Sequence, residues 1–185
     1  MATDAPLVPL PGNLNVVYDR DTMIIRRKWF SFMAVFLAFF ALFWNGFMIV
    51  WMTMAISSGV WIMAAFGCIH AAVGICMAYF AVASFVNKTD ISVDPNYLKV
   101  RHYPLPWKGA TEIRVHSIKQ LYCKEKISRS KNGVNVTYQV NVITEDNREQ
   151  KLLSGLQDSS QAHYIEKEIE AVLGIQNQAV SGEFR

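Results

Sequence analysis

Hydrophobic positions are distributed very unevenly along this chain. Between Lys28 and Lys88 there is no Asp, Glu, Lys or Arg, and the apolar run is interrupted only at Ser57-Ser58-Gly59. About 20 apolar residues are enough to span the hydrocarbon core of a bilayer. Each half of this run is longer, so the pattern predicts two transmembrane helices, over 29–56 and 60–87, joined by an external turn over 57–59.

The flanking charges predict the orientation of these helices. Basic residues flank the pair of helices in the sequence. Before the first helix stand Arg20, Arg26, Arg27 and Lys28, and after the second stand Lys88, Lys99, Arg101 and Lys108. The connecting turn has no basic residue. Because loops rich in Lys and Arg stay on the cytoplasmic side, we expect a two-pass protein with both termini in the cytoplasm.

Small residues predict how the two helices pack. Each helix carries a stripe of them at helical spacing: Ala34, Ala38, Ala41 and Asn45 in the first, and Gly67, Ala71, Gly74 and Ala78 in the second. Helices in lipid associate through such close-packing surfaces. A turn centred near residue 58 pairs position i with roughly 116 − i, which sets the two stripes face to face. The same stripes could instead serve a homodimer.

Asn45 and His70 are the most polar residues of the two helices, and this register brings them level. An unpaired amide or imidazole in hydrocarbon costs several kcal/mol. The sequence therefore predicts a hydrogen bond between Asn45 and His70. The functional alternative is that His70 ligates a haem or chlorophyll-type pigment, because ionisable residues inside membranes are often functional.

From Lys88 onward the apolar positions alternate, which predicts antiparallel strands. Turn signals at Asp94-Pro95-Asn96, at Asn132-Gly133 and at 145–147 separate six strands in meander order. Asp158 and Gln161 can then open a helix that Gly174 closes. This helix has an apolar face, and we expect its charged residues to face water: Glu166, Lys167, Glu168 and Glu170.

The two ends of the chain carry weaker patterns. Residues 13–28 predict a short β-hairpin that pairs with or packs on the C-terminal domain, or else a loose leader next to the membrane. Residues 1–12 are expected to be disordered, and residues 176–185 to form a flexible tail. The three cysteines, Cys68, Cys76 and Cys123, lack the spacing of a disulfide framework and are expected to be small packing residues.

The chain resembles small bacterial membrane proteins in which a helical hairpin precedes a PH-like domain. The stretches that carry this resemblance are Arg26-Arg27-Lys28-Trp29-Phe30-Ser31, 100–107 (VRHYPLPW), 118–122 (IKQLY) and the closing Tyr164-Ile165-Glu166 with Leu173-Gly174-Ile175. The resemblance implies a PH-like barrel over 88–175, mostly β with one C-terminal amphipathic helix, at the cytoplasmic face of the bacterial inner membrane. It implies no catalytic residues.

Candidate chemistry is sparse. The sequence has no phosphate-binding glycine loop, no H-E-x-x-H, no C-x-x-C and no nucleophile elbow, so neither an enzyme nor a metal site is predicted. The net charge of +3 is too small to indicate nucleic acid as a partner. A surface for anionic lipid or a protein partner is predicted from Arg26, Arg27, Lys28, Trp107, Lys124, Lys126, Arg129 and Lys131, although a merely solvated face explains the same charges.

Two functions are compatible with these observations. The first is a non-enzymatic, membrane-anchored interaction module whose domain binds a membrane or cytoplasmic protein complex, or anionic lipid, and needs no cofactor. The alternative is an accessory subunit of a membrane redox or light-harvesting complex, in which His70 lies near or on a haem or chlorophyll-type pigment.

Overall fold

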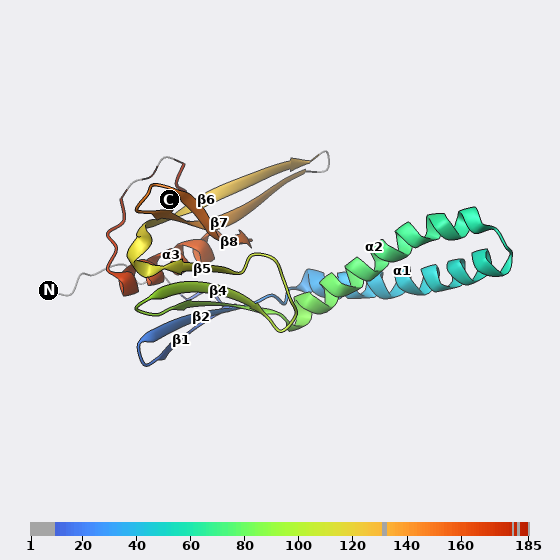
Figure 1. Ribbon diagram of the computed structural model, residues 1–185, viewed down its shortest axis with the longest axis horizontal. Helices are drawn as coiled ribbons and strands as arrows, with labels where there is room; N and C mark the ends of the chain where they lie inside the picture. The colour runs from blue at the N-terminus through green and yellow to red at the C-terminus, as the bar shows by residue number, and fades with distance from the viewer. Residues whose placement is uncertain (1–9, 131–132, 179, 181, 185) are drawn as a thin grey trace. The chain divides into compact units, whose positions relative to one another are not determined.

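The computed structural model describes residues 10–130, 133–178, 180 and 182–184 (Figure 1). The chain forms two compact units. A helical unit contains Trp29–Lys88 and Tyr103–Leu105, and a β-rich unit contains the residues up to Lys28, Thr89–His102 and those from Pro106 on. The predicted disordered leader falls outside the described residues except for 10–12, and Lys131 of the predicted basic surface also lies outside them.

The helical unit consists of two helices of 26 residues each, α1 (Phe32–Ser57) and α2 (Trp61–Val86). Both are long and apolar enough to cross a membrane, and only 17% and 22% of their most apolar windows are buried. The core helix of a soluble protein would be mostly buried. Large side chains such as those of Phe43 (72% exposed) and Ile62 (80% exposed) point outward instead. An apolar surface of this kind is stable in lipid and unfavourable in water.

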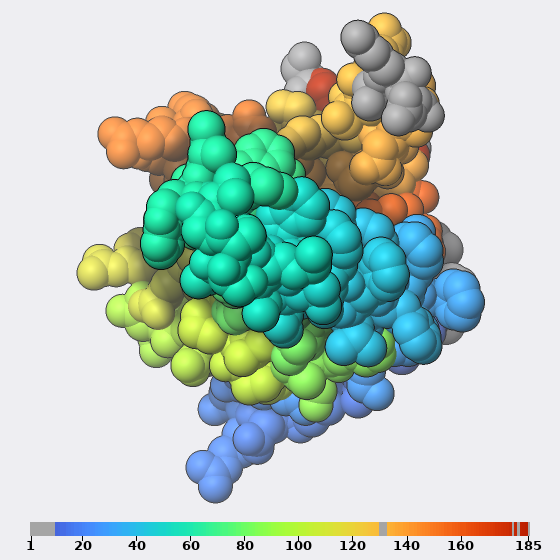
Figure 2. All heavy atoms as spheres, turned by 90° about the vertical axis from the view of Figure 1, so that its right-hand side faces the viewer, coloured from blue at the N-terminus to red at the C-terminus, as the bar shows by residue number. Residues whose placement is uncertain are grey.

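A seam of small residues joins α1 and α2, which lie side by side (Figure 2). The buried residues of α1 recur every seven positions: Ala34, Ala41, Met48 and Ala55. Those of α2 include Gly67, Gly74 and Ala81 at the same interval. A seven-residue repeat keeps one face of a helix against its partner. The remaining predicted packing residues, Ala38, Ala71 and Ala78, are half-buried on this seam.

The register of the seam differs from the predicted one by about three residues. A Cβ placed on Gly74 would lie 2.7 Å from Asn45 Oδ1, and one on Gly67 would meet the side chains of Trp51 and Met52. Position i therefore faces roughly 119 − i instead of 116 − i. The cause is the turn: α1 runs on through Ser57 and α2 begins only at Trp61, so the centre of the connection lies later in the chain.

A buried asparagine joins three segments of the helical unit by hydrogen bonds. Asn87 is the C-cap of α2 and is 1% exposed. Its Oδ1 accepts a hydrogen bond from Leu105 N at 2.8 Å, and its Nδ2 donates to Leu105 O at 3.1 Å. Its backbone carbonyl accepts from Trp29 N at 3.3 Å. One residue thus ties the entry to α1, the end of α2 and a segment further along the chain.

The β-rich unit contains two antiparallel sheets. One has five strands in the order β1-β2-β3-β4-β5 and the other three in the order β6-β7-β8. Their bounds are β1 Leu14–Asp19, β2 Thr22–Lys28, β3 Lys88–Val93, β4 Tyr97–Tyr103, β5 Thr111–Arg114, β6 Ile118–Ser130, β7 Gly133–Thr144 and β8 Glu149–Leu156. One hydrophobic core is shared by both sheets and by the C-terminal helix, with Ile91, Leu121 and Ile165 among its fully buried members.

The structure corrects the expectation of a closed barrel. The N-terminal hairpin of β1 and β2 adds to the edge of β3, as one of the two alternatives for 13–28 predicted. However, β5 has only four residues and is followed by the single 3₁₀ turn Val115–Ser117. The hydrogen-bonded ladder is therefore interrupted between β5 and β6. The strands remain in two sheets, and the described residues do not close a barrel.

The chain ends in helix α3 (Ser159–Leu173) and a segment that returns to the sheet. The carboxylate of Asp158 accepts a hydrogen bond from Ser160 N, which caps the helix, and Gly174 ends it in the left-handed conformation at φ 67°. The predicted flexible tail is in contact with β6 where it is described. Phe184 N donates to Cys123 O at 2.8 Å, and its ring lies 5.0 Å from that of Tyr138.

Candidate functional site

The polar residues of the helical unit are paired with backbone carbonyls. Asn45 Nδ2 donates to Ala41 O at 2.7 Å in its own helix and to Gly74 O at 2.9 Å in the facing helix. His70 Nδ1 lies 3.1 Å from Phe66 O, one turn earlier. The expected Asn45–His70 hydrogen bond is replaced by these contacts, because the later turn brings Asn45 level with Gly74, about one helical turn beyond His70.

His70 is nevertheless held in a defined position. Its ring centroid is 4.4 Å from that of Phe66 and 6.2 Å from that of Trp44. Trp44 Nε1 also donates to His70 O at 3.2 Å, so α1 contacts both the ring and the backbone of this residue. Aromatic neighbours lie on two sides of the ring. Because a carbonyl oxygen only accepts, the contact with Phe66 O is a hydrogen bond in the tautomer that carries its proton on Nδ1.

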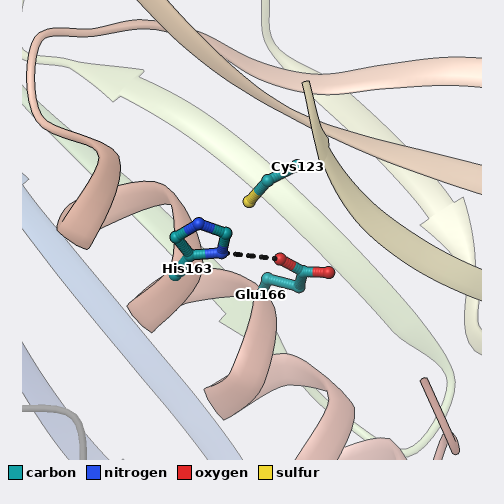
Figure 3. Close-up of side chains that lie close together, drawn as sticks. All are labelled: Cys123, His163 and Glu166. Carbon is teal, nitrogen blue, oxygen red and sulfur yellow. Dashed lines mark ion pairs between the residues drawn. The ribbon is translucent and has the colours of Figure 1, made fainter. Parts of the chain in front are cut away.

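A second cluster of functional groups lies in the β-rich unit, where the sequence predicted none. Cys123 of β6 and His163 and Glu166 of α3 bring a sulfur, a ring nitrogen and a carboxylate oxygen within 4.8 Å of one another. Figure 3 shows the two helical side chains directed toward the cysteine sulfur. Positions i and i+3 share one face of a helix, and that face of α3 packs on β6. We call Cys123, His163 and Glu166 the thiol cluster.

The thiol cluster is buried to different depths. Cys123 is fully buried and Glu166 is 2% exposed. His163 Nδ1 lies 3.5 Å from Glu166 Oε2, and the His163 side chain is 25% exposed. The imidazole therefore stands between solvent and the two buried groups, with the Phe184 ring stacked at 5.5 Å from its own.

Glu170 adds a second buried carboxylate next to the thiol cluster. It is 7% exposed, and its Oε1 has no hydrogen-bond partner among the described residues. Burial, and then the negative charge of Glu166, raise the pKa of Glu170 to about 7. Burial also raises the pKa of the Cys123 thiol above its ordinary value, helped by a hydrogen bond to Glu166 and by the charges of three carboxylates, Glu166, Glu170 and Glu183.

These contacts correct the assignment of the faces of α3. Glu166 and Glu170 were expected to face water, and both are buried. The returning C-terminal segment explains this, since Asn177 Nδ2 donates to Glu166 Oε1 at 3.4 Å and Phe184 lies over the same side of the helix. Helical periodicity distinguishes the apolar face of a helix from its charged face. It does not show whether a later segment of the chain covers the charged face.

Two arginines of the predicted basic surface form contacts within the β-rich unit. Arg26 holds Asp90 in a two-pronged ion pair, with Nε and Nη2 each 2.9 Å from a carboxylate oxygen. Arg27 Nη2 donates to Gly155 O at 3.4 Å, and burial lowers the pKa of Arg27. Lys28 remains exposed, and Trp107 is half-buried. The two arginines thus join strands of the unit.

The other predicted basic residues that the structure describes, Lys124, Lys126 and Arg129, lie on β6 of a long hairpin. Strand β8 pairs with β7 only over Tyr138–Ile143, the stretch that faces residues 120–125 of β6. Residues 126–130 of β6 and 133–137 of β7 therefore continue as two strands beyond the sheet (Figure 1). We call these residues the hairpin arm. Lys124 is 3.6 Å from Glu149, whereas Lys126 and Arg129 are exposed.

The hairpin arm also exposes apolar side chains. Ile127 is 51% exposed and Val134 is 64% exposed. Ile127 pairs with Val136, and Arg129 pairs with Val134. Because alternate residues of a strand share a face, these four side chains lie on one face of the arm. The sequence predicts the basic residues of this region. Its apolar face follows only from the strand register of the structure.

Comparison with known proteins leaves the chain to be interpreted from its own residues. No protein-family model matches it, and no curated protein matches it either.

Proposed function

We propose that the chain is a non-enzymatic, membrane-anchored interaction module of the bacterial inner membrane. The observation that carries this proposal is the helical unit: two charge-free helices of 26 residues that pack through small residues and expose large apolar side chains. The basic flanks put both termini in the cytoplasm. The β-rich unit is then presented at the cytoplasmic face, and its two antiparallel sheets followed by one helix support a PH-like domain.

The hairpin arm is the surface that best fits a ligand. Its apolar and basic side chains on one face, Ile127, Arg129 and Val134, are left exposed by the part of the chain that the structure describes. Arg129 beside Ile127 and Val134 suits an anionic surface, because each basic residue near such a membrane contributes about 1 kcal/mol and apolar side chains add burial. Anionic lipid is therefore the first ligand we propose, with an acidic surface of a protein complex as the second.

The anchoring is tested by accessibility labelling. Cysteine is placed at Ser58 or at Ser154 in a chain in which Cys68 and Cys76 are serine and the fully buried Cys123 is kept, and spheroplasts are treated with a membrane-impermeant maleimide. The parent chain without an added cysteine gives the background labelling. We expect labelling at position 58 in intact spheroplasts and at position 154 only after lysis, with the protein resisting extraction by alkaline carbonate. Release by carbonate, or labelling of position 154 before lysis, would contradict the proposal.

Photo-cross-linking tests the proposed ligand. A benzophenone amino acid is placed at Ile127, and the matched control carries it at Ser128, the next residue, which is exposed on the opposite face. Irradiation of native membranes should give an adduct at position 127 that position 128 lacks. Mass spectrometry then distinguishes a phospholipid adduct from a protein adduct. Equal or absent adducts at the two positions would exclude the arm as the binding surface.

His70 supports a second candidate function, a subunit that holds a haem or chlorophyll-type pigment. Histidines that ligate metals commonly use their second ring nitrogen to contact a backbone carbonyl or carboxylate. The contact of Nδ1 with Phe66 O fits this arrangement, since it leaves Nε2 as the ligand atom. A visible absorbance band in the protein purified in mild detergent, lost in His70→Ala, would support this function. A colourless, folded protein would exclude it.

A further inference from the structure

We propose that the thiol cluster binds a zinc ion that fastens α3 to β6. The cluster supplies one thiol, one imidazole and one carboxylate from two rigid elements. Thiolate and imidazole are ligands that select zinc among the common cellular divalent ions, whereas magnesium and calcium take oxygen ligands alone. Nothing in the proposed anchoring or in the hairpin arm depends on this site, so it is an additional property of the β-rich unit.

The distances fit a metal site after a small adjustment. Three atoms that all lie within 4.8 Å of one another have a common centre at most ~2.8 Å from each. Zinc lies about 2.3 Å from a cysteine sulfur and about 2.0 Å from a histidine nitrogen or a carboxylate oxygen. Contraction by less than about 1 Å is within the reach of side-chain rotation. His163 Nδ1 and Glu166 Oε2, at 3.5 Å, already have the separation of two ligands on one tetrahedral ion.

A further buried carboxylate stands beside the cluster. Glu170 follows Glu166 by one helical turn and is 93% buried, with its Oε1 unpartnered among the described residues. Buried carboxylate oxygens normally have a hydrogen-bond partner, so this atom is an independent indication that a group is missing. The oxygens of Glu170 are not among the atoms that lie within 4.8 Å of one another, so Glu170 would have to turn toward the ion to complete the four protein ligands of a closed structural zinc site.

Charge also favours a cation at this position. The two buried carboxylates of α3 face a thiol, and in the described part of the chain the ion-pair partner of Glu166 is His163, which is charged only when protonated. A divalent ion would neutralise the thiolate and one carboxylate together. The partly exposed His163 gives the ion a path from solvent to the buried ligands.

Cobalt substitution tests the site in the full-length protein in detergent micelles. The protein is kept reduced, stripped with a chelator and titrated with Co²⁺, and the absorbance of tetrahedral cobalt and of sulfur-to-cobalt charge transfer is recorded. We expect both signals to saturate at one ion per chain and to disappear when Zn²⁺ is added. Wild-type protein that shows no such bands at saturating Co²⁺ overturns the proposal.

Two sets of variants assign the ligands. In Cys123→Ser the charge-transfer band should vanish, while a matched Cys68→Ser/Cys76→Ser variant, altered only in α2, should bind as wild type. Because Cys123 is buried, His163→Gln at the partly exposed position provides the decisive variant if Cys123→Ser does not fold. Folding of His163→Gln is checked by circular dichroism, and we expect it to bind Co²⁺ about tenfold or more weakly. Wild-type affinity in folded His163→Gln, or a charge-transfer band that survives in Cys123→Ser, overturns the proposal.

Discussion

A single methyl group at Gly74 should weaken the packing of α1 against α2. In Gly74→Ala the new Cβ would lie 2.7 Å from Asn45 Oδ1 and 2.8 Å from Trp44 Cδ1. Real Cβ atoms do not approach other atoms so closely, so one side chain or one helix must move. Asn45 has little freedom to do so, because its amide already bridges Ala41 O and Gly74 O. We expect the bond to Gly74 O to be lost.

The size of the effect follows from three contributions. Overpacking a close contact costs about 1–3 kcal/mol, and an interhelical hydrogen bond in a membrane contributes about 0.6 kcal/mol, at most about 1.7. The higher helix propensity of alanine returns up to about 1 kcal/mol. Gly46→Ala provides the matched control, since it is the same change in the same hairpin and its Cβ would meet nothing within 4 Å. The gain in helix propensity is common to both variants and cancels, so relative to this control Gly74→Ala should lower the free energy of unfolding by about 2–3 kcal/mol.

The measurement is an SDS titration of the full chain in mixed micelles, followed by tryptophan fluorescence. Trp44 and Trp51 stand next to the two buried glycines and report the separation of the helices. Gly67→Ala adds a graded case, because its Cβ would meet the flexible end of Met52, which can swing away. The expected order of stability is Gly46→Ala, then Gly67→Ala, then Gly74→Ala. A Gly74→Ala variant as stable as Gly46→Ala would refute the seam described above.

Three further predictions concern the β-rich unit. Arg26→Lys replaces a two-pronged contact with Asp90 by a single one, and thermal unfolding should show a loss of about 0.5–1 kcal/mol. Asp158→Ala removes the cap of α3 and should lower the unfolding free energy in urea by about 1 kcal/mol. With chelator present, stability should fall as pH rises from about 4.5 to about 7, because the folded chain binds the Glu170 proton more tightly than the unfolded chain does. Glu170→Gln should remove this slope and be the more stable protein at pH 8, and an unchanged slope would refute the assignment of the slope to Glu170.

The sequence predicted the elements of the helical unit well because each depends on local composition. A charge-free run of this length has few alternatives, and the small residues define the face along which the helices meet. Register was harder to predict. It depends on where the turn begins, and α1 continues through Ser57. A shift of three residues was enough to replace the Asn45–His70 bond by bonds to backbone carbonyls.

The strands were predictable for the same local reason, and their closure was not. Alternation and turn signals locate β3 to β8 along the chain. Whether neighbouring strands continue one ladder depends on short connections such as Val115–Ser117, where a 3₁₀ turn takes the place of a hairpin. Composition gives no signal for that choice. The two sheets of five and three strands therefore emerged only from the structure.

The thiol cluster shows what periodicity omits. His163, Glu166 and Glu170 follow one another at intervals of three and four residues, which is a stripe on one face of α3. Taken alone, such a stripe on an amphipathic helix indicates a solvated face. It becomes a buried site because Cys123, forty residues earlier, faces it from β6 and the C-terminal segment covers it. A later segment that folds back over a charged helical face turns it into a buried one, and helical spacing alone does not predict this. The proposed zinc ion would then add positive charge beside the two buried carboxylates of α3, of which Glu166 has His163 as its ion-pair partner in the described part of the chain.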